Sequence, residues 1–184
     1  MSNRIFFTSD THFNHKSILT FCPTTRHGSS VEEMNELLIE RWNEDVALGD
    51  RVYILGDFAF GNKTSTEEIL KRLKGRLFLI KGNHDYWVNE ATSKYFEAIY
   101  DYKTINVEGQ KVVMFHYPIF EWDAMHYGAY HLYGHVHGST TIPGRALDVG
   151  IDARPQRDMR LWSWEEVDAT LKTREIRTHH GKAD

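Results

Sequence analysis

The chain has 184 residues, of which 41% are hydrophobic and 26% are charged, and its formal net charge is -4 at pH 7. This balance excludes a disordered or fibrous protein, and the length predicts one domain, residues 1–184, around a single core. Because the net charge is negative and no long basic run occurs, non-specific nucleic-acid binding is not supported.

The cysteine content and the lengths of the apolar runs limit the possible metal ligands and compartments. Cys22 is the only cysteine, which excludes an internal disulfide and a thiolate-rich zinc cluster and fits a reducing compartment. The apolar run at residues 5–7 is too short for a signal peptide, and no later run is long enough to span a bilayer. We therefore expect a cytoplasmic protein without a membrane partner, whose metals are held by nitrogen and oxygen. The oligomeric state stays open.

Short apolar runs with β-branched or aromatic residues predict strands along most of the chain. They occupy residues 4–7, 51–55, 76–80, 111–115, 130–133 and 145–149. Capping-box pairs predict three helices, which open at Ser30 with Glu33, Thr64 with Glu67, and Ser163 with Glu166. Gly75 is predicted to end the second helix. The alternation predicts a layered α/β sheet in the first half, and the closer spacing after residue 99 predicts a hairpin-rich second half.

Five polar motifs come directly or a few residues after predicted strands. In chain order they are Asp10-Thr11-His12, Gly56-Asp57, Gly82-Asn83-His84-Asp85, His116 and Gly134-His135-Val136-His137. The carboxyl ends of strands are where open α/β sheets assemble ligand sites. A second Gly-Asp pair allows a comparison, because Asp50 precedes the strand at 51–55 whereas Asp57 follows it. Asp50 is therefore predicted to be a turn residue on the opposite rim.

The donor types in these motifs predict a centre for two cations. The candidate ligands are two carboxylates, one amide oxygen and four imidazoles: Asp10, Asp57, Asn83, His12, His116, His135 and His137. In extended backbone, residues two apart point the same way, so Asp10 with His12, and His135 with His137, can each direct two ligands to one point. Mixed imidazole and carboxylate donors suit manganese, iron, zinc or nickel, and of these we expect manganese.

Such a centre is suited to in-line attack at phosphorus. Two divalent ions roughly 3.5 to 4 Å apart can hold a bridging water, lower its pKa to about 7, and clamp a phosphoryl oxygen opposite the attacking hydroxide. Two ions, two carboxylates and one hydroxide leave a formal charge of about +1, which attracts an anionic substrate. His84 is the candidate proton donor to the leaving alkoxide, and Asp85 can favour its imidazolium form. Gly82 permits a sharp turn in this loop.

The five motifs, in this order, resemble the signature of the calcineurin-like metallophosphoesterase superfamily over residues 10–137. The resemblance implies an α/β fold, a four-layer α/β/β/α sandwich of two mixed β-sheets flanked by helices. It also implies His84 as the acid, Asp85 as its partner and two four-ligand metal positions that share one carboxylate. The implied ligands are Asp10, His12, Asp57 and His137 for one metal, and Asp57, Asn83, His116 and His135 for the other. Flanking residues are similar to a subgroup of small bacterial and phage phosphoesterases.

One departure concerns how the substrate is gripped. Ser/Thr protein phosphatases of this superfamily have an arginine shortly after the Gly-Asp motif, whereas residues 58–61 of this chain are Phe-Ala-Phe-Gly. Protein phosphatase activity is therefore not expected. Arg26, in the loop after the first motif, is the candidate cation that grips the phosphoryl group, with His15 as a further candidate substrate-binding residue. The alternative is that Arg26 and His15 are ordinary surface residues without a role in substrate binding.

We predict an enzyme that hydrolyses small phosphorylated substrates, preferably phosphodiesters or nucleotide-type molecules, with a phosphomonoesterase as the alternative. A non-catalytic scaffold of the same fold is a further alternative, disfavoured because the full ligand set and His84 are present. The aromatic segment at residues 117–131 either lines a substrate pocket or, as we prefer, packs a loop onto the sheet. Cys22 is expected to be a small buried hydrophobe, and the tail with His179 and His180 to lie at the surface.

Overall fold

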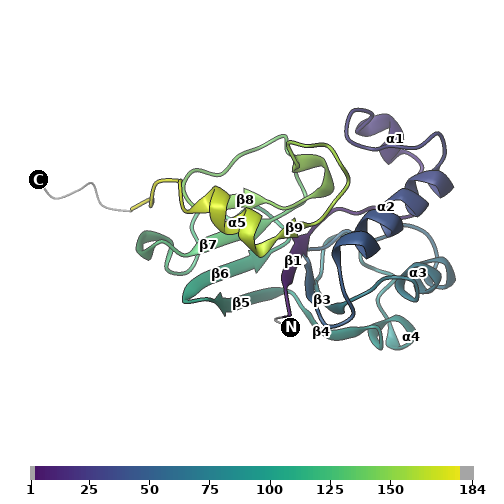
Figure 1. Cartoon of the computed structure of the whole chain (residues 1–184), viewed down its shortest axis with the longest axis horizontal. Coiled ribbons are helices and arrows are strands. Elements are labelled where there is room, and N and C mark those ends of the chain that lie inside the picture. The colour runs from purple at the N-terminus through teal and green to yellow at the C-terminus, as the bar shows by residue number, and fades with distance from the viewer. Residues whose placement is uncertain (1–2, 179–184) are drawn as a thin grey trace, which may run out of the picture.

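The computed structural model describes residues 3–178, so the surface position predicted for His179 and His180 lies outside it. In this part of the chain, nine strands form two mixed sheets, and five α-helices and two short 3-10 helices connect or cover them (Figure 1). The prediction of an α/β fold with two mixed sheets is confirmed. No helix within residues 3–178 has both the length and the apolar character needed to cross a membrane.

The first sheet has the strand order β4-β3-β2-β1-β9. Its strands are β1 (Ile5–Thr8), β2 (Arg51–Ile54), β3 (Arg76–Ile80), β4 (Phe96–Tyr100) and β9 (Trp162–Ser163). The first four are parallel, and β9 joins β1 in the antiparallel sense. The connections carry α1 (Ile18–Phe21), α2 (Val31–Asp45), α3 (Lys63–Leu70) and α4 (Glu90–Ser93). Parallel strands with helical crossovers place the ends of β1, β2 and β3 on one rim.

The second sheet has the order β5-β6-β7-β8. Its strands are β5 (Tyr102–Val107), β6 (Gln110–Phe115), β7 (Tyr130–Tyr133) and β8 (Ala146–Asp148). Only β5 and β6 form a hairpin, and β6, β7 and β8 are parallel. The prediction of a hairpin-rich second half is therefore wrong. The segments 116–129 and 134–145 are long enough for the crossovers that parallel pairing requires, about a dozen residues.

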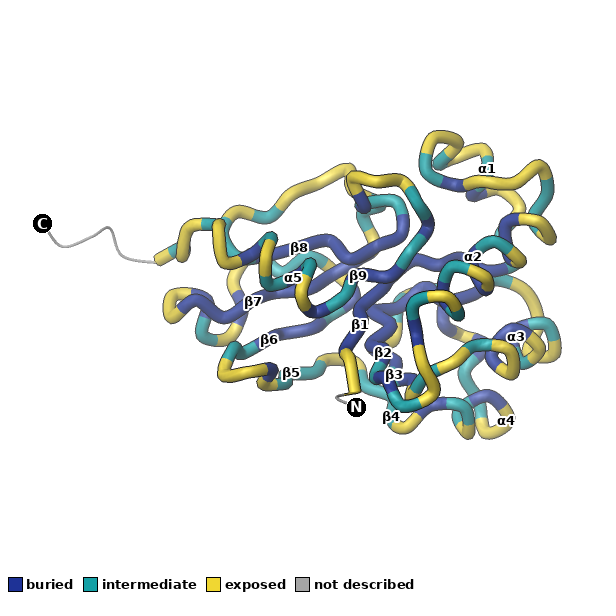
Figure 2. The backbone as a smooth tube through the Cα atoms, in the orientation of Figure 1, coloured by how far each residue is buried: buried dark blue, intermediate teal, exposed yellow. Residues whose placement is uncertain are grey.

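The side chains alternate along the strands and divide the core into layers. On β1, Phe7 packs between the two sheets, whereas Phe6 faces the core under α2 and α3. On β6, Met114 packs between the sheets and Val113 faces outward. The helix α5 (Trp164–Leu171) closes the inter-sheet core, and the buried backbone runs through the sheets while the outer loops are exposed (Figure 2). This is the period-two pattern of strands covered on both faces.

The segment that follows β6 covers the outer face of the second sheet. Trp122 and His131 are buried there, and the 3-10 helix Met125–Tyr127 continues this cover. The preferred interpretation of residues 117–131 as a loop packed onto the sheet is thus confirmed for these side chains. Tyr117, which is partly exposed, instead lies beside His135, with 4.6 Å between ring centroids.

The helix ends test the capping predictions. Ser30 accepts a hydrogen bond from the Glu33 backbone at the start of α2, and Ser163 with Glu166 forms the complete capping box of α5. The start predicted for α3 is wrong, because Asn62, two residues before Thr64, caps that helix.

The end predicted for α3 is also wrong, since the helix stops at Leu70 rather than at Gly75. Beyond Leu70 the chain turns back toward α2, where Arg72 pairs with Glu36. Gly75 instead lies in the turn before β3 with φ +102°, and a Cβ there would lie 2.8 Å from Val46. Glycine is therefore needed for this turn rather than for a helix cap.

Candidate metal centre

The structure brings the five motifs together where the strands end. Asp10 and Asp57 follow β1 and β2, and His116 follows β6 directly. Ser9 at the end of β1 bridges to Gly150 after β8, which joins the rims of the two sheets. Asp50 lies at the other end of β2, where it accepts hydrogen bonds from the backbone N–H groups of Arg4 and Ala47. The assignment of Asp50 as a turn residue on the opposite rim is confirmed.

The backbone that presents the ligands differs from the extended form we predicted. Five of the seven candidate ligands have left-handed backbone conformations, with φ between 48° and 72°: Asp10, His12, Asp57, His135 and His137. This region costs non-glycine residues of order 1 to 3 kcal/mol each, and such residues cluster at functional sites. Aspartate and histidine tolerate it better than most side chains. The three motifs that contain these residues therefore turn sharply at their candidate ligands instead of continuing in an extended form.

Two glycines allow the motifs to approach each other. A Cβ at Gly134 would lie 1.8 Å from Ser9 Oγ and 2.4 Å from Asp10 Oδ2. A Cβ at Gly82 would lie 2.3 Å from Asp57 Oδ1. Gly82 is thus required by close packing against Asp57 rather than by the sharp turn that we expected, since a side chain at either glycine would push apart two ligand-bearing loops.

Each candidate carboxylate is held through one oxygen and keeps the other for the centre. Asp10 Oδ2 accepts a hydrogen bond from the backbone N–H of His135 at 2.8 Å, and Asp57 Oδ1 accepts one from the backbone N–H of His84 at 2.9 Å. Asp57 Oδ2 lies 3.9 Å from His12 Nε2 and 3.6 Å from His116 Nε2. The remaining oxygen of Asp57 therefore lies between imidazoles from two different motifs.

Three of the imidazoles are oriented in the same manner. His116 Nδ1 lies 2.7 Å from the Leu55 carbonyl oxygen, and His137 Nδ1 lies 2.7 Å from Asp152 Oδ2. His12 Nδ1 lies 3.0 Å from Nδ1 of a further histidine, His15. In His116 and His137, Nδ1 donates to an oxygen, which leaves the lone pair of Nε2 free, as in histidine ligands fixed by an outer hydrogen bond. His12 has the same arrangement when His15 accepts the hydrogen of its Nδ1.

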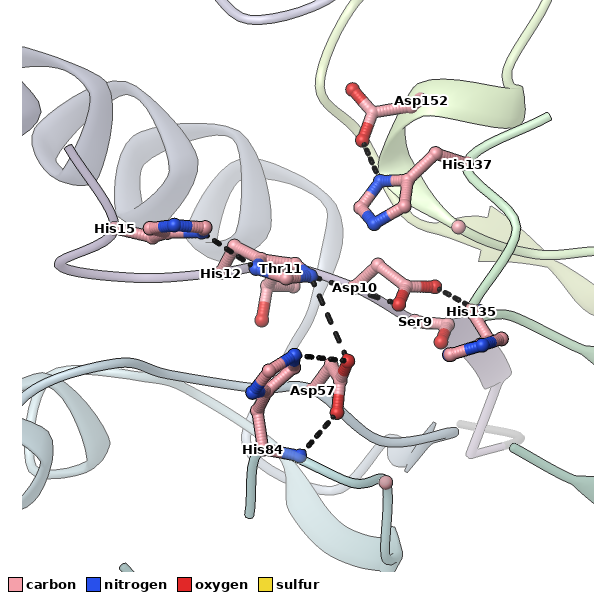
Figure 3. A network of polar contacts seen from close by, with 12 residues as sticks. Ser9, Asp10, Thr11, His12, His15, Asp57, His84, His135, His137 and Asp152 are labelled. Atoms are coloured by element: carbon pink, nitrogen blue, oxygen red, sulfur yellow. Dashed lines mark hydrogen bonds and ion pairs between the residues drawn. The ribbon is translucent and has the colours of Figure 1, made fainter. Parts of the chain in front are cut away.

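These contacts produce two groups of ligand atoms. Figure 3 shows Asp10, His12 and His137 of the first group together with Asp57 and His135 of the second. In each group, the atoms of three side chains lie within 4.8 Å of one another. The groups are Asp10, His12 and His137, and Asp57, His116 and His135. Asn83 Oδ1 lies 3.1 Å from His116 Nε2, so the amide joins the second group. The structure thus brings all seven predicted ligands to one place.

The residues present fit bound cations. Asp10 Oδ1 and His12 Nε2 are buried, lie 3.8 Å apart and have no hydrogen-bond partner. Leaving buried polar atoms unpaired is costly, and a native structure with two of them side by side indicates a ligand for both. Carboxylate oxygen and imidazole nitrogen are ordinary donors to divalent transition metals. Asp10 Oδ1 and His12 Nε2 are therefore candidates for direct contact with a cation.

The pKa shifts of Asp10, His12 and His135 favour the protonation states that bind metal, whereas burial of His137 is outweighed by its hydrogen bond to Asp152 and the charge of Asp10, which raise its pKa. Burial acts to raise the pKa of Asp10, but the close contact with His12 and the charge of His137 outweigh burial and lower that pKa. Burial lowers the pKa of His12 and of His135. An ionised carboxylate beside neutral imidazoles is the form in which these side chains act as ligands.

Asp85 has a different partner from the one we predicted. Its carboxylate is buried and accepts hydrogen bonds from the backbone N–H groups of Asp57, Phe58 and Gly82 and from Trp87 Nε1, at 2.8 to 3.1 Å. These four donors fill the lone-pair sites of a carboxylate, and none of them belongs to His84. Asp85 therefore fixes the Gly-Asp loop to its own loop, and the prediction that it holds the His84 imidazole is wrong.

His84 lies at the rim of the centre with its side chain 40% exposed, and its Nε2 is 3.9 Å from Asp57 Oδ2. The ring of Phe60 lies against it, with 4.5 Å between ring centroids. Phe60 also stacks on His15 at 3.9 Å. An accessible imidazole beside the ligand groups can exchange a proton with a molecule bound there.

Arg26 does not face a substrate. Its side chain is fully buried, where Nε and Nη2 donate to Asp152 at 2.8 and 2.7 Å and Nη1 donates to the Thr11 carbonyl at 2.7 Å. Nη2 also donates to the Asp10 carbonyl. The prediction that Arg26 grips the phosphoryl group is therefore wrong, because its donors are already used to hold the first motif.

Asp152 is the residue of the centre that we did not predict. Burial acts to raise its pKa, but the hydrogen bonds from His137 and Arg26 outweigh burial and lower that pKa. Asp152 thus stays ionised and links the first motif to the last. Asp152 follows the predicted strand at 145–149. It could therefore have been found from its position after the carboxyl end of a strand, as Asp57 was.

The contacts of His15 and Cys22 also differ from those predicted from the sequence. His15 has its Nδ1 directed at His12, as described above, so it supports a candidate ligand rather than a substrate as predicted. Cys22 is partly buried, and burial raises the pKa of its thiol to about 11. The prediction of Cys22 as a small buried hydrophobe is therefore met only in part, and its raised pKa gives no sign of an activated thiol.

Comparison with known proteins finds one family model and two similar sequences. The model of the calcineurin-like phosphoesterase superfamily domain matches residues 4–143. An uncharacterized protein of Methanocaldococcus jannaschii is 34% identical over 138 residues, covering 74% of this chain and 70% of its own. The Gene 66 protein of Mycobacterium phage D29 is 28% identical over 184 residues, covering 83% of this chain and 89% of its own.

A solved structure shares the fold. The crystal structure of a protein of unknown function from Aquifex aeolicus superposes with a TM-score of 0.70 at 25% identity, covering 92% of this chain and 100% of that one. The matched family domain includes all five motifs, from Asp10 to His137. The chain therefore belongs to the calcineurin-like phosphoesterase superfamily, a family of metal-dependent hydrolases.

Proposed function

We propose that the protein hydrolyses small phosphodiesters of the nucleotide type, using two divalent metal ions held by the seven ligands described above. The observation that carries the proposal is the pair of buried atoms without partners, Asp10 Oδ1 and His12 Nε2, beside the shared oxygen of Asp57. A binding scaffold has no need for this arrangement, because an empty polar pocket of this kind lowers stability without benefit.

The ligands divide between two positions. The first would be held by Asp10, His12, Asp57 and His137, and the second by Asp57, Asn83, His116 and His135. The oxygen of Asp57 that lies between His12 and His116 supports its role as the bridge. Ions bound there would supply an activated water and positive charge for the phosphoryl oxygens, and manganese suits the donor set.

The remaining side chains have distinct roles. His84 lies at the open rim, where it can donate a proton to the leaving alkoxide. Asp85 keeps the loop of His84 against the loop of Asp57 through its four hydrogen bonds. His15 and Asp152 orient the rings of His12 and His137 from behind.

Diesters are favoured over monoesters by charge. A phosphodiester carries one negative charge, whereas a phosphomonoester carries about 1.5 to 2 at neutral pH. Arg26, the cation that would offset the second charge, is buried against Asp152. We therefore propose a phosphodiesterase first and a phosphomonoesterase second.

Two chromogenic substrates test whether diesters are preferred over monoesters. Metal-free protein is supplemented with Mn²⁺, Fe²⁺, Zn²⁺ or Ni²⁺ and assayed with bis-p-nitrophenyl phosphate and p-nitrophenyl phosphate, with Asp57→Ala as the inactive control. We expect metal-dependent turnover of both and a higher kcat/KM for the diester. A higher kcat/KM for the monoester would reverse the order, and the absence of turnover with every metal would contradict the enzymatic proposal.

A further inference from the structure

A cavity of about 420 Å³ adjoins the metal centre on the side of His137. Its walls include residues 21–25, at the end of α1, and residues 152–155 and 157, beyond β8. His137 and Asp152 line the cavity and also belong to the centre, so a molecule bound at the metals extends directly into it. The negative charge of Asp152 in the wall is neutralised by Arg26, which leaves the cavity open to an anion.

Arg157 lines this cavity and also the neighbouring cavity beside His27, and it has no carboxylate partner among residues 3–178. The other arginines nearby are all paired: Arg26 with Asp152, Arg154 with Asp158 and Glu166, and Arg160 with Glu44 and Asp45. An arginine side chain presents a fork of donors that matches a phosphate group.

The backbone of Arg157 is held in place although its side chain is exposed. It has a left-handed conformation with φ 53°, its N–H donates to the Arg154 carbonyl at 3.1 Å, and its carbonyl lies 2.8 Å from His27 Nε2. The contact with His27 joins the segment to the loop before α2. A strained backbone that neighbouring groups keep in place indicates a position with a role.

Phe21 provides the second feature of the cavity. Its ring is 70% exposed at the end of α1, and it meets the ring of His15 edge-on at 6.2 Å. Exposed aromatic side chains at a site can stack on a planar ring, which is worth about 1 to 3 kcal/mol for a nucleic-acid base. The cavity thus combines a planar contact with a free cation.

We infer that this cavity binds a nucleoside of the substrate, with its base on Phe21 and a terminal phosphate, separate from the phosphodiester that is hydrolysed, at Arg157. The inference rests on the proposed function and names its substrate class: short oligonucleotides that carry an end phosphate. A long nucleic acid is not expected to fit, since the net charge of -4 and the absence of a long basic run in the sequence offer no continuous basic track.

Dinucleotides with and without an end phosphate test the inference by turnover. Wild type, Arg157→Gln and Arg157→Lys are assayed with adenylyl-(3′→5′)-adenosine (ApA) and its 5′- and 3′-phosphorylated forms. We expect a phosphorylated form to have a kcat/KM about tenfold above ApA in wild type, a preference that Arg157→Gln abolishes and Arg157→Lys partly restores. Lys16→Gln, which removes a charge that lines a different cavity with no candidate ligand, should keep the preference.

Equilibrium binding gives a readout that does not need turnover. Calorimetric titration of metal-free protein with adenosine 5′-monophosphate and adenosine should show tighter binding of the monophosphate by about fivefold, lost in Arg157→Gln. Phe21→Leu should weaken both ligands. Equal ratios in wild type and Arg157→Gln, in either experiment, would overturn the inference. Failure of the wild type to hydrolyse bis-p-nitrophenyl phosphate would instead refute the proposed function. In that case the binding comparison would still test whether Arg157 binds the phosphate.

Discussion

The Nδ1 atoms of His12 and His15 lie 3.0 Å apart. Two imidazole nitrogens at this distance share one hydrogen, so one ring donates and the other accepts. Burial, with a smaller contribution from His12, lowers the pKa of His15 to about 4, which keeps His15 neutral. A neutral His15 that accepts from His12 leaves His12 Nε2 unprotonated and directed at Asp10, 3.8 Å away. His15 therefore orients a candidate metal ligand.

Removing this acceptor should weaken metal binding. Loss of an outer hydrogen bond to a histidine ligand costs about 10- to 100-fold in metal affinity, so His15→Ala should lose affinity by this factor. His15→Asn, which can place an oxygen near the same point, should recover part of it. Titration of Mn²⁺ into metal-free protein measures both. Unchanged affinity in His15→Ala would mean that the contact with His12 has no orienting role.

Asp85→Ala should damage the fold more than His84→Ala. The aspartate accepts from three backbone N–H groups in the buried loops, and each unsatisfied group costs about 1 to 3 kcal/mol. We expect Asp85→Ala to lower the free energy of unfolding by on the order of 4 kcal/mol and His84→Ala by less than about 1 kcal/mol. Urea denaturation of the metal-free proteins measures the difference. Equal stability of the two variants would restore the view of Asp85 as a mere partner of His84.

The loss of activity in His84→Ala should depend on the leaving group of the substrate. If His84 protonates the departing alkoxide, the variant should lose about 10²- to 10⁴-fold in kcat for alkyl leaving groups and less for p-nitrophenolate, which departs without a proton. A series of diesters that differ only in leaving-group pKa measures how the loss in kcat changes with that pKa. The metal content should equal that of the wild type. A uniform loss across the series would assign His84 a role in binding rather than in proton transfer.

Strand positions and donor chemistry were sufficient to locate the centre. The distinction between Asp50 and Asp57 needed only the direction of one strand, because side chains after a parallel strand gather on a common rim. The turn geometry of the ligands could not be predicted in this way. The left-handed conformation of Asp10 depends on the close approach of Gly134, more than 120 residues away in the chain.

The roles of the supporting residues were also beyond the sequence. Arg26 and Asp152 are 126 residues apart, and nothing in either segment indicates that their charges neutralise each other. Likewise, β4, β5 and β9 were not predicted: β4 and β5 have few buried residues, and β9 has only two residues. Their pairing depends on partners elsewhere in the sheets.

Acid should destabilise the protein through His131, away from the metal centre. This side chain is buried, its Nε2 accepts from the Ile119 backbone at 3.0 Å, and burial lowers its pKa to about 4. Because the unfolded chain has the ordinary pKa of about 6.5, the folded state binds fewer protons between these values. The contribution is complete above about pH 6.5 and is lost as the pH falls to about 4, on the order of 3 kcal/mol.

Comparison with His131→Gln isolates this contribution. The variant keeps a group that can accept from Ile119 but does not titrate. Urea denaturation of both metal-free proteins from pH 7 to pH 4 should show the wild type losing stability relative to the variant by on the order of 3 kcal/mol. Parallel curves would show that His131 is protonated without cost.

The metal content of the protein tests the central claim most directly. Metal-free protein is dialysed to equilibrium against Mn²⁺, and bound metal per chain is measured by inductively coupled plasma mass spectrometry for wild type and Asp57→Ala. With Asp57 bridging two positions, we predict about two ions per wild-type chain and a loss of both in the variant at the same free concentration. A single ion in the wild type, or two ions retained in Asp57→Ala, would contradict the account.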